Sequence, residues 1–262
     1  MIMMKYLFFS IQLIYKIYYL ILFSGLLLVT FPVYYFLLSQ PGRYKYAFPM
    51  MRYHAFLILV LTGVFMKVKG KNNIPSTGAF VLCSNHSSFV DTWCIYSLFK
   101  RYFVFTGKKE IEKWPLFHIF YTSGMNIMVD RSSLASSFRA LRRMAFELKK
   151  GIPLVIFPEG TRSKEAPTLA PFKPGAFAVA IQSQVPILPV TFVSNWKLLG
   201  GGNFLTSSAM PGISEVVIHA PISTLGLTKT DVDELSQKVR MIIQFPIDTH
   251  CVALPQTLSR VQ

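Results

Sequence analysis

FVLCSNHSSFVD, at residues 80–91, joins an apolar run, a polar turn and the start of a helix. The run that ends at Ser84 is typical of a strand, and Ser88 can cap a helix that continues toward Phe99. On one continuous helix, a separation of five residues turns about 140°, so the side chains of His86 and Asp91 would point apart. They can meet only if His86 lies in the turn ahead of the helix and Asp91 lies in its first turn.

This pairing of residue types suits acid–base chemistry. A neutral imidazole is a natural general base near neutral pH, and a nearby carboxylate fixes its tautomer and stabilises its charged form. A purely structural explanation is also open, because Ser88 and Asp91 have the spacing of a capping box with Asp in place of Glu. Asn85-His86-Ser87 also matches a glycosylation sequon, which is a weak signal in any chain.

Around this stretch, short apolar runs alternate with amphipathic ones. This pattern predicts an α/β fold, with a mostly parallel central sheet flanked by helices. Ligands of such sheets bind beyond the carboxyl ends of the strands, where His86 is expected. The expected strands cover residues 80–84, 102–106, 126–130, 154–157, 187–192 and 215–219. The expected helices cover residues 91–99, 110–121, 134–150, 176–182 and 230–244.

The N-terminal segment is expected to be a hydrophobic helical membrane anchor. No residue from 17 to 40 carries a formal charge, and that length is enough to span a bilayer. Residues 53–66 are too few to cross alone and are interpreted as a re-entrant or interfacial helix. The alternative for both segments is a buried helical hairpin. The predicted division is therefore residues 1–71 for membrane-anchoring helices and 72–262 for an α/β catalytic domain, which the excess of Lys and Arg after the span places in the cytoplasm.

Composition favours a membrane partner. The 262 residues include 27 Lys and Arg against 12 Asp and Glu, a formal charge of +15, with 52% apolar residues. A basic and apolar chain suits an anionic membrane surface with phosphorylated ligands. The chain lacks zinc-finger spacing and RNA-binding aromatic motifs, so no nucleic-acid partner is expected. Three cysteines without a CxxC pair fit a reducing compartment, and without a motif such as HExxH no metal is expected.

FPEGTRS, at residues 157–163, follows an expected strand and is a candidate phosphate site. The planar guanidinium of Arg162 matches phosphate oxygens in a bidentate way. Gly160 allows a close backbone approach, Thr161 adds a hydroxyl and an amide, and Glu159 can orient Arg162 or bind a polyol hydroxyl. The alternative is a surface turn with a local Glu–Arg ion pair.

Two further charged sites lie at expected strand ends. GMNIMVDR, at residues 124–131, places Arg131 where it can supply a second cation, and Lys108 can reach a phosphate. Either is an ordinary strand end if taken alone. VPILPV, at residues 185–190, has the pattern of a buried strand framed by prolines.

Together, and in this order, NHSSFVD, the strand ending in DR, FPEGTRS and VPILPV resemble the 1-acyl-sn-glycerol-3-phosphate acyltransferases of the glycerolipid acyltransferase superfamily. The resemblance covers about residues 72–192 and rests on the His-x4-Asp (HX4D) motif with its companions. It implies that His86 and Asp91 form a catalytic dyad. It also implies that Glu159, Gly160, Thr161 and Arg162 bind the glycerol phosphate, and that residues 124–131, ending in Arg131, contribute to acceptor binding. Asn85, Ser87 and Lys108 are further candidates for substrate binding.

The resemblance implies transfer of an acyl chain from acyl-CoA or acyl-carrier protein to the sn-2 hydroxyl of lysophosphatidic acid, giving phosphatidic acid at a membrane, the inner membrane in a bacterium. The substrate hydroxyl takes the place of a serine nucleophile, and no cofactor is expected. Amides near Ser87 are candidates for stabilising the oxyanion. Alternatives are another lysophospholipid or glycerol-3-phosphate as acceptor, or an inactive lipid-binding homologue.

Overall fold

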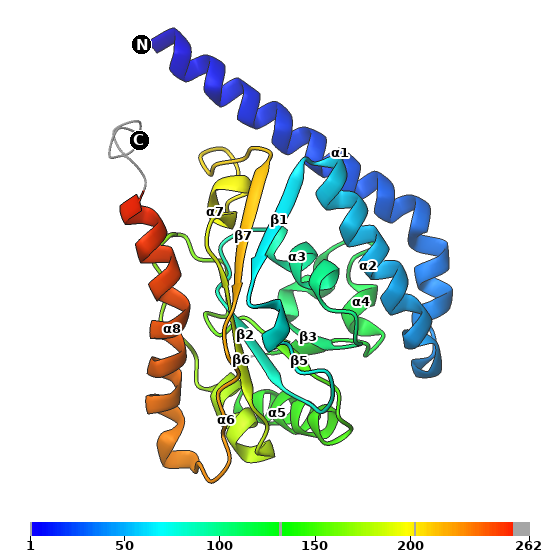
Figure 1. Cartoon of the computed structure of the whole chain (residues 1–262). Coiled ribbons are helices and arrows are strands. Elements are labelled where there is room, and N and C mark those ends of the chain that lie inside the picture. Colours follow the sequence, from blue (N-terminus) through cyan, green and yellow to red (C-terminus); the bar gives the residue numbers. More distant parts are fainter. Residues whose placement is uncertain (1, 131–132, 202, 254–262) are drawn as a thin grey trace.

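A seven-stranded sheet forms the centre of the protein, with the strand order β1-β7-β6-β2-β5-β3-β4 (Figure 1). The structure is a computed structural model that describes residues 2–130, 133–201 and 203–253. The strands are β1 (Val64–Lys69), β2 (Val81–Ser84), β3 (Val104–Lys108), β4 (Ile127–Val129), β5 (Leu154–Ile156), β6 (Ile187–Phe192) and β7 (Gly212–Ile218).

The sheet is mostly parallel, as the sequence predicted. The central strand β2 pairs in parallel with both β5 and β6, and β3 pairs in parallel with β5 and β4. Among the paired strands of the described residues, only β6 and β7 are antiparallel, and β7 is in turn parallel to β1. Five strands therefore point their carboxyl ends at one edge of the sheet, where a ligand site of an α/β fold is expected.

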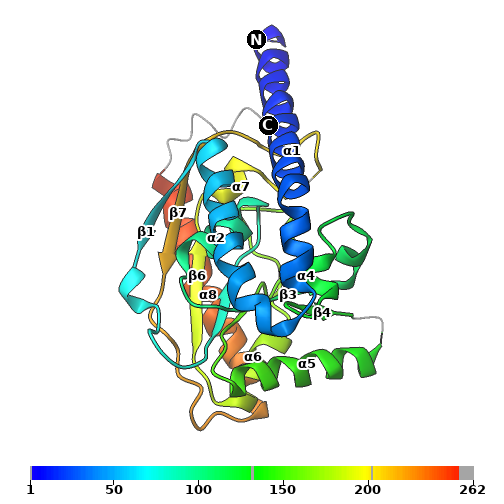
Figure 2. The same ribbon diagram turned by 90° about the vertical axis from the view of Figure 1, so that its right-hand side faces the viewer.

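Helices cover both faces of the sheet (Figures 1 and 2). Successive side chains of β2 point to opposite faces of the sheet. Leu82 belongs to the core beneath α1, α2 and α3. Val81 and Cys83 belong to the core beneath α5, α6 and α8. The helices are α1 (Ile2–Leu38), α2 (Tyr44–Leu61), α3 (Val90–Leu98), α4 (Ile119–Thr122), α5 (Leu134–Lys149), α6 (Gly175–Ser183), α7 (Asn195–Leu198) and α8 (Val232–Ala253).

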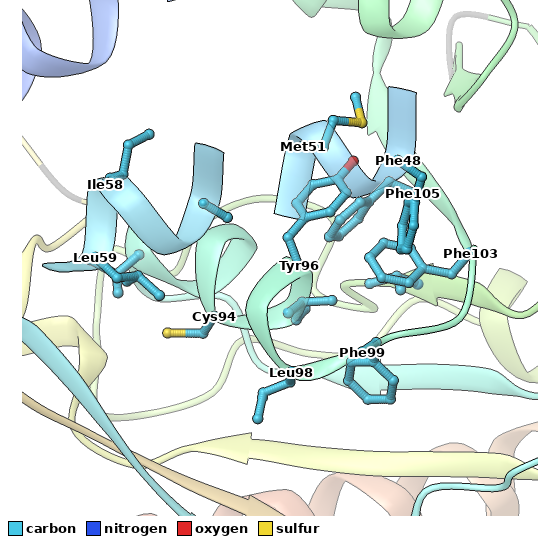
Figure 3. Close-up of a cluster of buried hydrophobic side chains, with 14 of the residues drawn as sticks. Phe48, Met51, Ile58, Leu59, Cys94, Tyr96, Leu98, Phe99, Phe103 and Phe105 are labelled. Carbon is cyan, nitrogen blue, oxygen red and sulfur yellow. The ribbon is translucent and has the colours of Figure 1, made fainter. Parts of the chain in front are cut away.

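Aromatic side chains fill the core between α2, α3 and β3 (Figure 3). The ring of Phe48 on α2 meets the ring of Phe103 edge-on, with centroids 5.0 Å apart, and Tyr96 on α3 lies 5.2 Å from Phe103. Such geometries are favourable for aromatic pairs. This packing fixes α3, and with it Asp91, against the end of the sheet.

Residues 53–66 differ from the interpretation as one interfacial helix. The helix α2 begins earlier, at Tyr44, and ends at Leu61, and the rest of the run becomes strand β1. Gly63 makes the turn between them with φ 68°, a conformation that favours glycine. Strand β1 thus joins the sheet although it precedes the predicted boundary at residue 71, which stays a prediction.

The expected helix over residues 110–121 is also different. A short 3-10 helix covers Lys109–Lys113, and α4 begins at Ile119. Pro115 and Leu116 lie between them, and Leu116 has φ 61°, which no α-helix permits. The helical periodicity of this stretch therefore breaks at its proline.

Helix α1 is the one helix of the described residues that is long and apolar enough to cross a membrane, by length and composition, over Tyr6–Leu38. One side of it is packed on the protein. Lys16 is buried and donates from Nζ to the carbonyl oxygen of Phe204 at 2.6 Å, and the Tyr19 hydroxyl accepts from Trp93 Nε1 at 2.7 Å. The other side exposes large apolar residues such as Ile21 and Val29.

Candidate active site

His86 and Asp91 meet as the sequence predicted. Strand β2 ends at Ser84 and α3 begins at Val90, so His86 lies in the connecting turn and Asp91 in the first turn of the helix. Nδ1 of His86 lies 2.9 Å from Oδ2 of Asp91. A carboxylate acceptor requires a proton on Nδ1, which leaves the lone pair of Nε2 free to take a proton. The His86 side chain is 18% exposed, so this nitrogen can be reached.

Asp91 is completely buried and compensated by hydrogen bonds. Its Oδ2 also accepts the amides of Ser87 and Ser88, at 2.8 and 2.9 Å. The hydrogen bond from the Ser88 amide to Asp91 is one half of the predicted capping box. The other half is absent, because the Ser88 hydroxyl donates to the Leu199 carbonyl and accepts the Val90 amide. The carboxylate therefore organises the turn and orients His86 at the same time.

Asn195 is a site residue that the sequence reasoning missed. It begins α7, just after β6, and its Nδ2 donates to Oδ1 of Asp91 at 2.8 Å. Its own Oδ1 is buried without a hydrogen-bond partner. The position after a strand was the only sequence signal, and no motif surrounds it.

Phe157 and Glu159 support His86 from the neighbouring strand β5. The imidazole stacks on the ring of Phe157, with centroids 4.0 Å apart and planes 12° apart. Glu159 accepts the backbone amide of His86 on Oε1 at 2.8 Å and that of Ala170 on Oε2 at 2.9 Å. Both oxygens are thus occupied by the backbone. Burial raises the Glu159 pKa to about 7, although the two amides act in the opposite direction.

Arg162 lies over the ring of Phe89, with its guanidinium carbon 3.6 Å from the ring centroid. Within residues 2–130, 133–201 and 203–253, neither its guanidinium nor the amides of Thr161 and Arg162 have a hydrogen-bond partner. Burial lowers the Arg162 pKa from its ordinary value, and the charge of Asp91 opposes this effect. A partly desolvated cation with free donors is suited to binding an anion.

A glycine of the loop after α7 packs against the stem of Arg162. A Cβ on Gly201 would lie 2.6 Å from the Cβ of Arg162, so a larger residue would displace that side chain. The Gly201 amide also donates to the carbonyl of Ser87 at 2.8 Å. This loop therefore closes the site from the side of β6.

The other predicted substrate contacts differ from one another in their surroundings. Asn85 is buried and exchanges two hydrogen bonds with the backbone of Phe192, so it ties the turn to β6. Gly160 turns the chain with φ 72°, and Lys108 is exposed at the end of β3. Arg131 lies outside the described residues.

The expectation about the oxyanion donors is wrong for two amides. The amides of Ser87 and Ser88 donate to Asp91, so they are not free to stabilise an oxyanion. The Ser87 hydroxyl, in contrast, is buried without a partner beside His86.

An apolar pocket lies near the site. Helices α1, α2, α3 and α4 and strand β3 contribute its walls. Two residues of the wall, Thr92 and Trp93, follow Asp91 directly on α3. A third, Phe105, stacks on Phe157, whose ring in turn stacks on His86. The walls of the pocket therefore lie next to residues that contact the dyad, although neither His86 nor Asp91 lines the pocket. Of the described residues, no group of three His, Cys, Asp or Glu could hold a metal ion.

A His–Asp pair and an Arg without a hydrogen-bond partner among the described residues thus lie together at the carboxyl ends of β2 and β5. Residues 65–193 match the family model described as Acyltransferase. The chain belongs to the acyltransferase family that includes the 1-acyl-sn-glycerol-3-phosphate acyltransferases.

Curated relatives agree with this assignment, and a solved structure shares the fold. The chain is 33% identical over 190 residues to the 1-acyl-sn-glycerol-3-phosphate acyltransferase of Saccharomyces cerevisiae. This match covers 72% of the chain and 61% of the yeast protein. It is 30% identical over 189 residues to the alpha enzyme of Mus musculus, covering 69% of this chain and 62% of that protein. The chain thus spans less than two thirds of the length of these relatives. The crystal structure of the 1-acyl-sn-glycerophosphate (LPA) acyltransferase PlsC from Thermotoga maritima shares the fold, with a TM-score of 0.72, 22% identity, and coverage of 96% of this chain and 99% of that one.

Proposed function

We propose that this protein transfers an acyl chain from a thioester donor to the sn-2 hydroxyl of lysophosphatidic acid. The observation that carries the proposal is the free Nε2 of His86. Asp91 orients this ring through its Nδ1, and the same turn contains Phe89, on whose ring the unpaired Arg162 lies. A base and an anion-binding cation at one site suit an acceptor that has both a hydroxyl and a phosphate.

The chemistry needs no covalent enzyme intermediate. His86 Nε2 takes the proton of the acceptor hydroxyl as its oxygen attacks the thioester carbonyl carbon. The tetrahedral intermediate collapses, the carbon–sulfur bond breaks, and the thiolate leaves with the proton from the imidazolium. Asp91, itself held by three other donors, keeps the ring in one tautomer and stabilises its positive charge during this step.

Arg162 and the amides of Thr161 and Arg162 are proposed to bind the acceptor phosphate. The fork of the guanidinium and two backbone donors offer a charge-assisted, directional site. Glu159 is proposed to act indirectly, because its carboxylate holds the His86 turn and the segment before α6. Lys108 and Arg131 remain proposed as additional cations for a phosphorylated substrate.

The apolar pocket is proposed to take the acyl chain. Its walls are mostly aromatic and aliphatic, and burying hydrocarbon there is favourable by about 0.8 kcal/mol per methylene. The exposed apolar side of α1 is proposed to attach the protein to a membrane, where a lysophospholipid acceptor is found.

The function is tested by assaying the purified full-length protein in detergent micelles. Lysophosphatidic acid, glycerol-3-phosphate and lysolipids with choline or ethanolamine headgroups are each offered with acyl-CoA and with acyl-carrier protein. We expect phosphatidic acid, identified by mass spectrometry, as the main product. Preferred acylation of another acceptor would replace lysophosphatidic acid in the proposal, and no acyl transfer at all would favour an inactive lipid-binding protein.

A further inference from the structure

Lys16 is a buried cation in the long apolar helix α1, with only 1% of its surface exposed. Its ammonium donates to the carbonyl oxygen of Phe204 at 2.6 Å and to that of Leu205 at 3.4 Å, and it lies 5.6 Å from the centroid of the Phe204 ring. Taking a charge out of water is costly unless the charge gains such partners. An unbranched apolar side chain would fill the same space without that cost, so packing alone does not account for a lysine at this position.

The loop that Lys16 binds follows α7 and includes residues 199–201 and 203–209. In both views α1 runs beside this loop between α7 and β7 (Figures 1 and 2). The amide of Gly200 donates to the carbonyl of Ser208 at 2.9 Å, which joins the two ends of the loop at its base. The carbonyls that Lys16 binds therefore belong to a closed loop, and a contact at its far end also restrains its base.

The base of this loop contacts the residues assigned to chemistry and to phosphate binding. The amide of Gly201 donates to the carbonyl of Ser87, in the turn that contains His86, at 2.8 Å. The backbone of Gly201 also lies against the stem of Arg162, because a Cβ on this glycine would be 2.6 Å from the Arg162 Cβ and 2.9 Å from its Cδ. Arg162 is thus held at its stem by Gly201 and at its guanidinium by the ring of Phe89.

We propose that Lys16 is a positioning residue for Arg162. By holding the loop on α1, its ammonium keeps Gly201 against the Arg162 stem, so the guanidinium stays in the orientation that meets the acceptor phosphate. Without the ammonium the loop can move off Arg162, and the freed side chain must be ordered again each time a phosphate binds. This inference rests on the proposed function, because it takes Arg162 as the phosphate-binding residue. Helix α1 then contributes to acceptor binding as well as to membrane attachment.

A neighbouring contact of α1 leads away from this loop and provides a matched control. Tyr15 donates its hydroxyl to the carbonyl of Thr62 at 2.8 Å, just after α2 ends. Like Lys16, it joins a side chain of α1 to a backbone carbonyl of a distant segment. Tyr15→Phe therefore removes one comparable hydrogen bond from the same part of the helix and leaves the loop beside Arg162 as it is.

The test measures steady-state kinetics of the full-length protein in detergent micelles, with lysophosphatidate varied at a saturating concentration of the acyl donor. We expect Lys16→Met, which keeps an unbranched side chain, to raise the lysophosphatidate KM about three- to ten-fold and to leave kcat and the donor KM as they are. Lys16→Arg should keep most of the affinity, because it can still donate to the two carbonyls. Tyr15→Phe should change none of the three constants.

A double-mutant cycle separates positioning from general stability. In an Arg162→Ala protein, Lys16→Met should have no further effect on the lysophosphatidate KM. Gly201→Ala, whose methyl group would meet the Arg162 stem, tests the same contact from the loop and should raise the same KM. It also serves where Lys16→Met does not fold, since an unchanged KM in Gly201→Ala overturns the inference.

The outcomes separate this inference from the proposed function. No rise of the KM in Lys16→Met, or the same rise with and without Arg162, overturns the inference and leaves acyl transfer standing. Binding of a short-chain lysophosphatidate, followed by calorimetry, gives a readout without turnover. Weaker binding in both Lys16→Met and Gly201→Ala, but not in Tyr15→Phe, supports the inference even in a protein that transfers no acyl chain. Equal binding by all four proteins overturns it.

Discussion

Asn195 donates its side-chain amide to Oδ1 of Asp91, while His86 occupies the other oxygen of the same carboxylate. The first bond is 2.8 Å and the second 2.9 Å. Three residues from three separate elements thus form one buried chain of hydrogen bonds. The carboxylate is fixed from both sides, which leaves the His86 ring little freedom to turn away from a substrate.

Replacing Asn195 should slow the chemical step. Asn195→Ala leaves one oxygen of a buried carboxylate without its donor, and we expect kcat to fall about ten-fold with little change in the acceptor KM. Steady-state kinetics with the acceptor varied at saturating donor measure this split. Asn73→Ala is a matched control, because Asn73 donates to the Ile218 carbonyl at the other end of the sheet. Equal losses in the two variants would assign Asn195 to stability alone.

Removing the base itself should have a larger effect. We expect His86→Ala to lose roughly 10²–10⁴-fold in kcat while the protein stays folded. Asp91→Asn should also be severely impaired, because its new amide group faces existing donors. His118→Ala removes a half-buried histidine outside the dyad and serves as the control. Normal turnover in His86→Ala, with the fold checked by circular dichroism, would remove His86 from the mechanism.

Arg162 should separate phosphate binding from chemistry. We expect Arg162→Ala to raise the lysophosphatidate KM roughly ten- to a hundred-fold, from the loss of a charge-assisted contact of about 1.5–3 kcal/mol. Arg162→Lys should recover part of it, since Lys offers a charge without the planar fork. Lys164→Ala, an exposed neighbour, should have no effect. A rise confined to the donor KM would move Arg162 to the binding of CoA phosphates.

The sequence predicted those site residues that lie together in a short motif. It did not predict those that reach the site through packing between distant segments. His86, Asp91 and the strand–turn–helix around them lie within a few residues, so their spacing restricts their geometry. Glu159 was assigned to the correct loop, but its two backbone partners depend on how that loop folds over β2. Asn195 and Gly201 reach the site through the neighbouring strand β6, and pairing of strands across the sheet leaves no signal in a single sequence.

The fold shows the same division. The strands over residues 154–157 and 187–192 were predicted nearly to the residue, because runs of branched apolar side chains between turns mark buried strands. Strand β1 was missed, because Val64–Lys69 continues an apolar run that began in a helix. Its partner β7 lies far along the chain, and only that pairing gives it an extended conformation.

Helix α1 should keep the protein on membranes. We expect the full-length chain to remain in the membrane fraction after a carbonate wash, because its exposed side is apolar along the helix. Ile21→Asp with Val29→Asp should release it, at a cost to insertion of about 2.5–3.5 kcal/mol per charge. Leu225→Asp places the same charge on an exposed apolar residue outside α1 and should not. Release of the unaltered protein by carbonate would contradict the anchor.

Glu159 should give folding stability a distinctive dependence on pH. Its pKa is about 7 in the folded protein, against an ordinary value of 4.5. The folded state therefore binds the proton more tightly than the unfolded state, so stability from this group is present below about pH 4.5 and is lost as pH rises through 7. The expected loss is about 3 kcal/mol in the free energy of unfolding.

Other groups titrate in the same pH range, so the difference between the unaltered protein and Glu159→Gln isolates the contribution of Glu159. Urea unfolding across the window should show a steeper fall for the unaltered protein than for Glu159→Gln. Parallel curves would mean that the carboxyl group is ionised throughout, held in that form by the amides of His86 and Ala170.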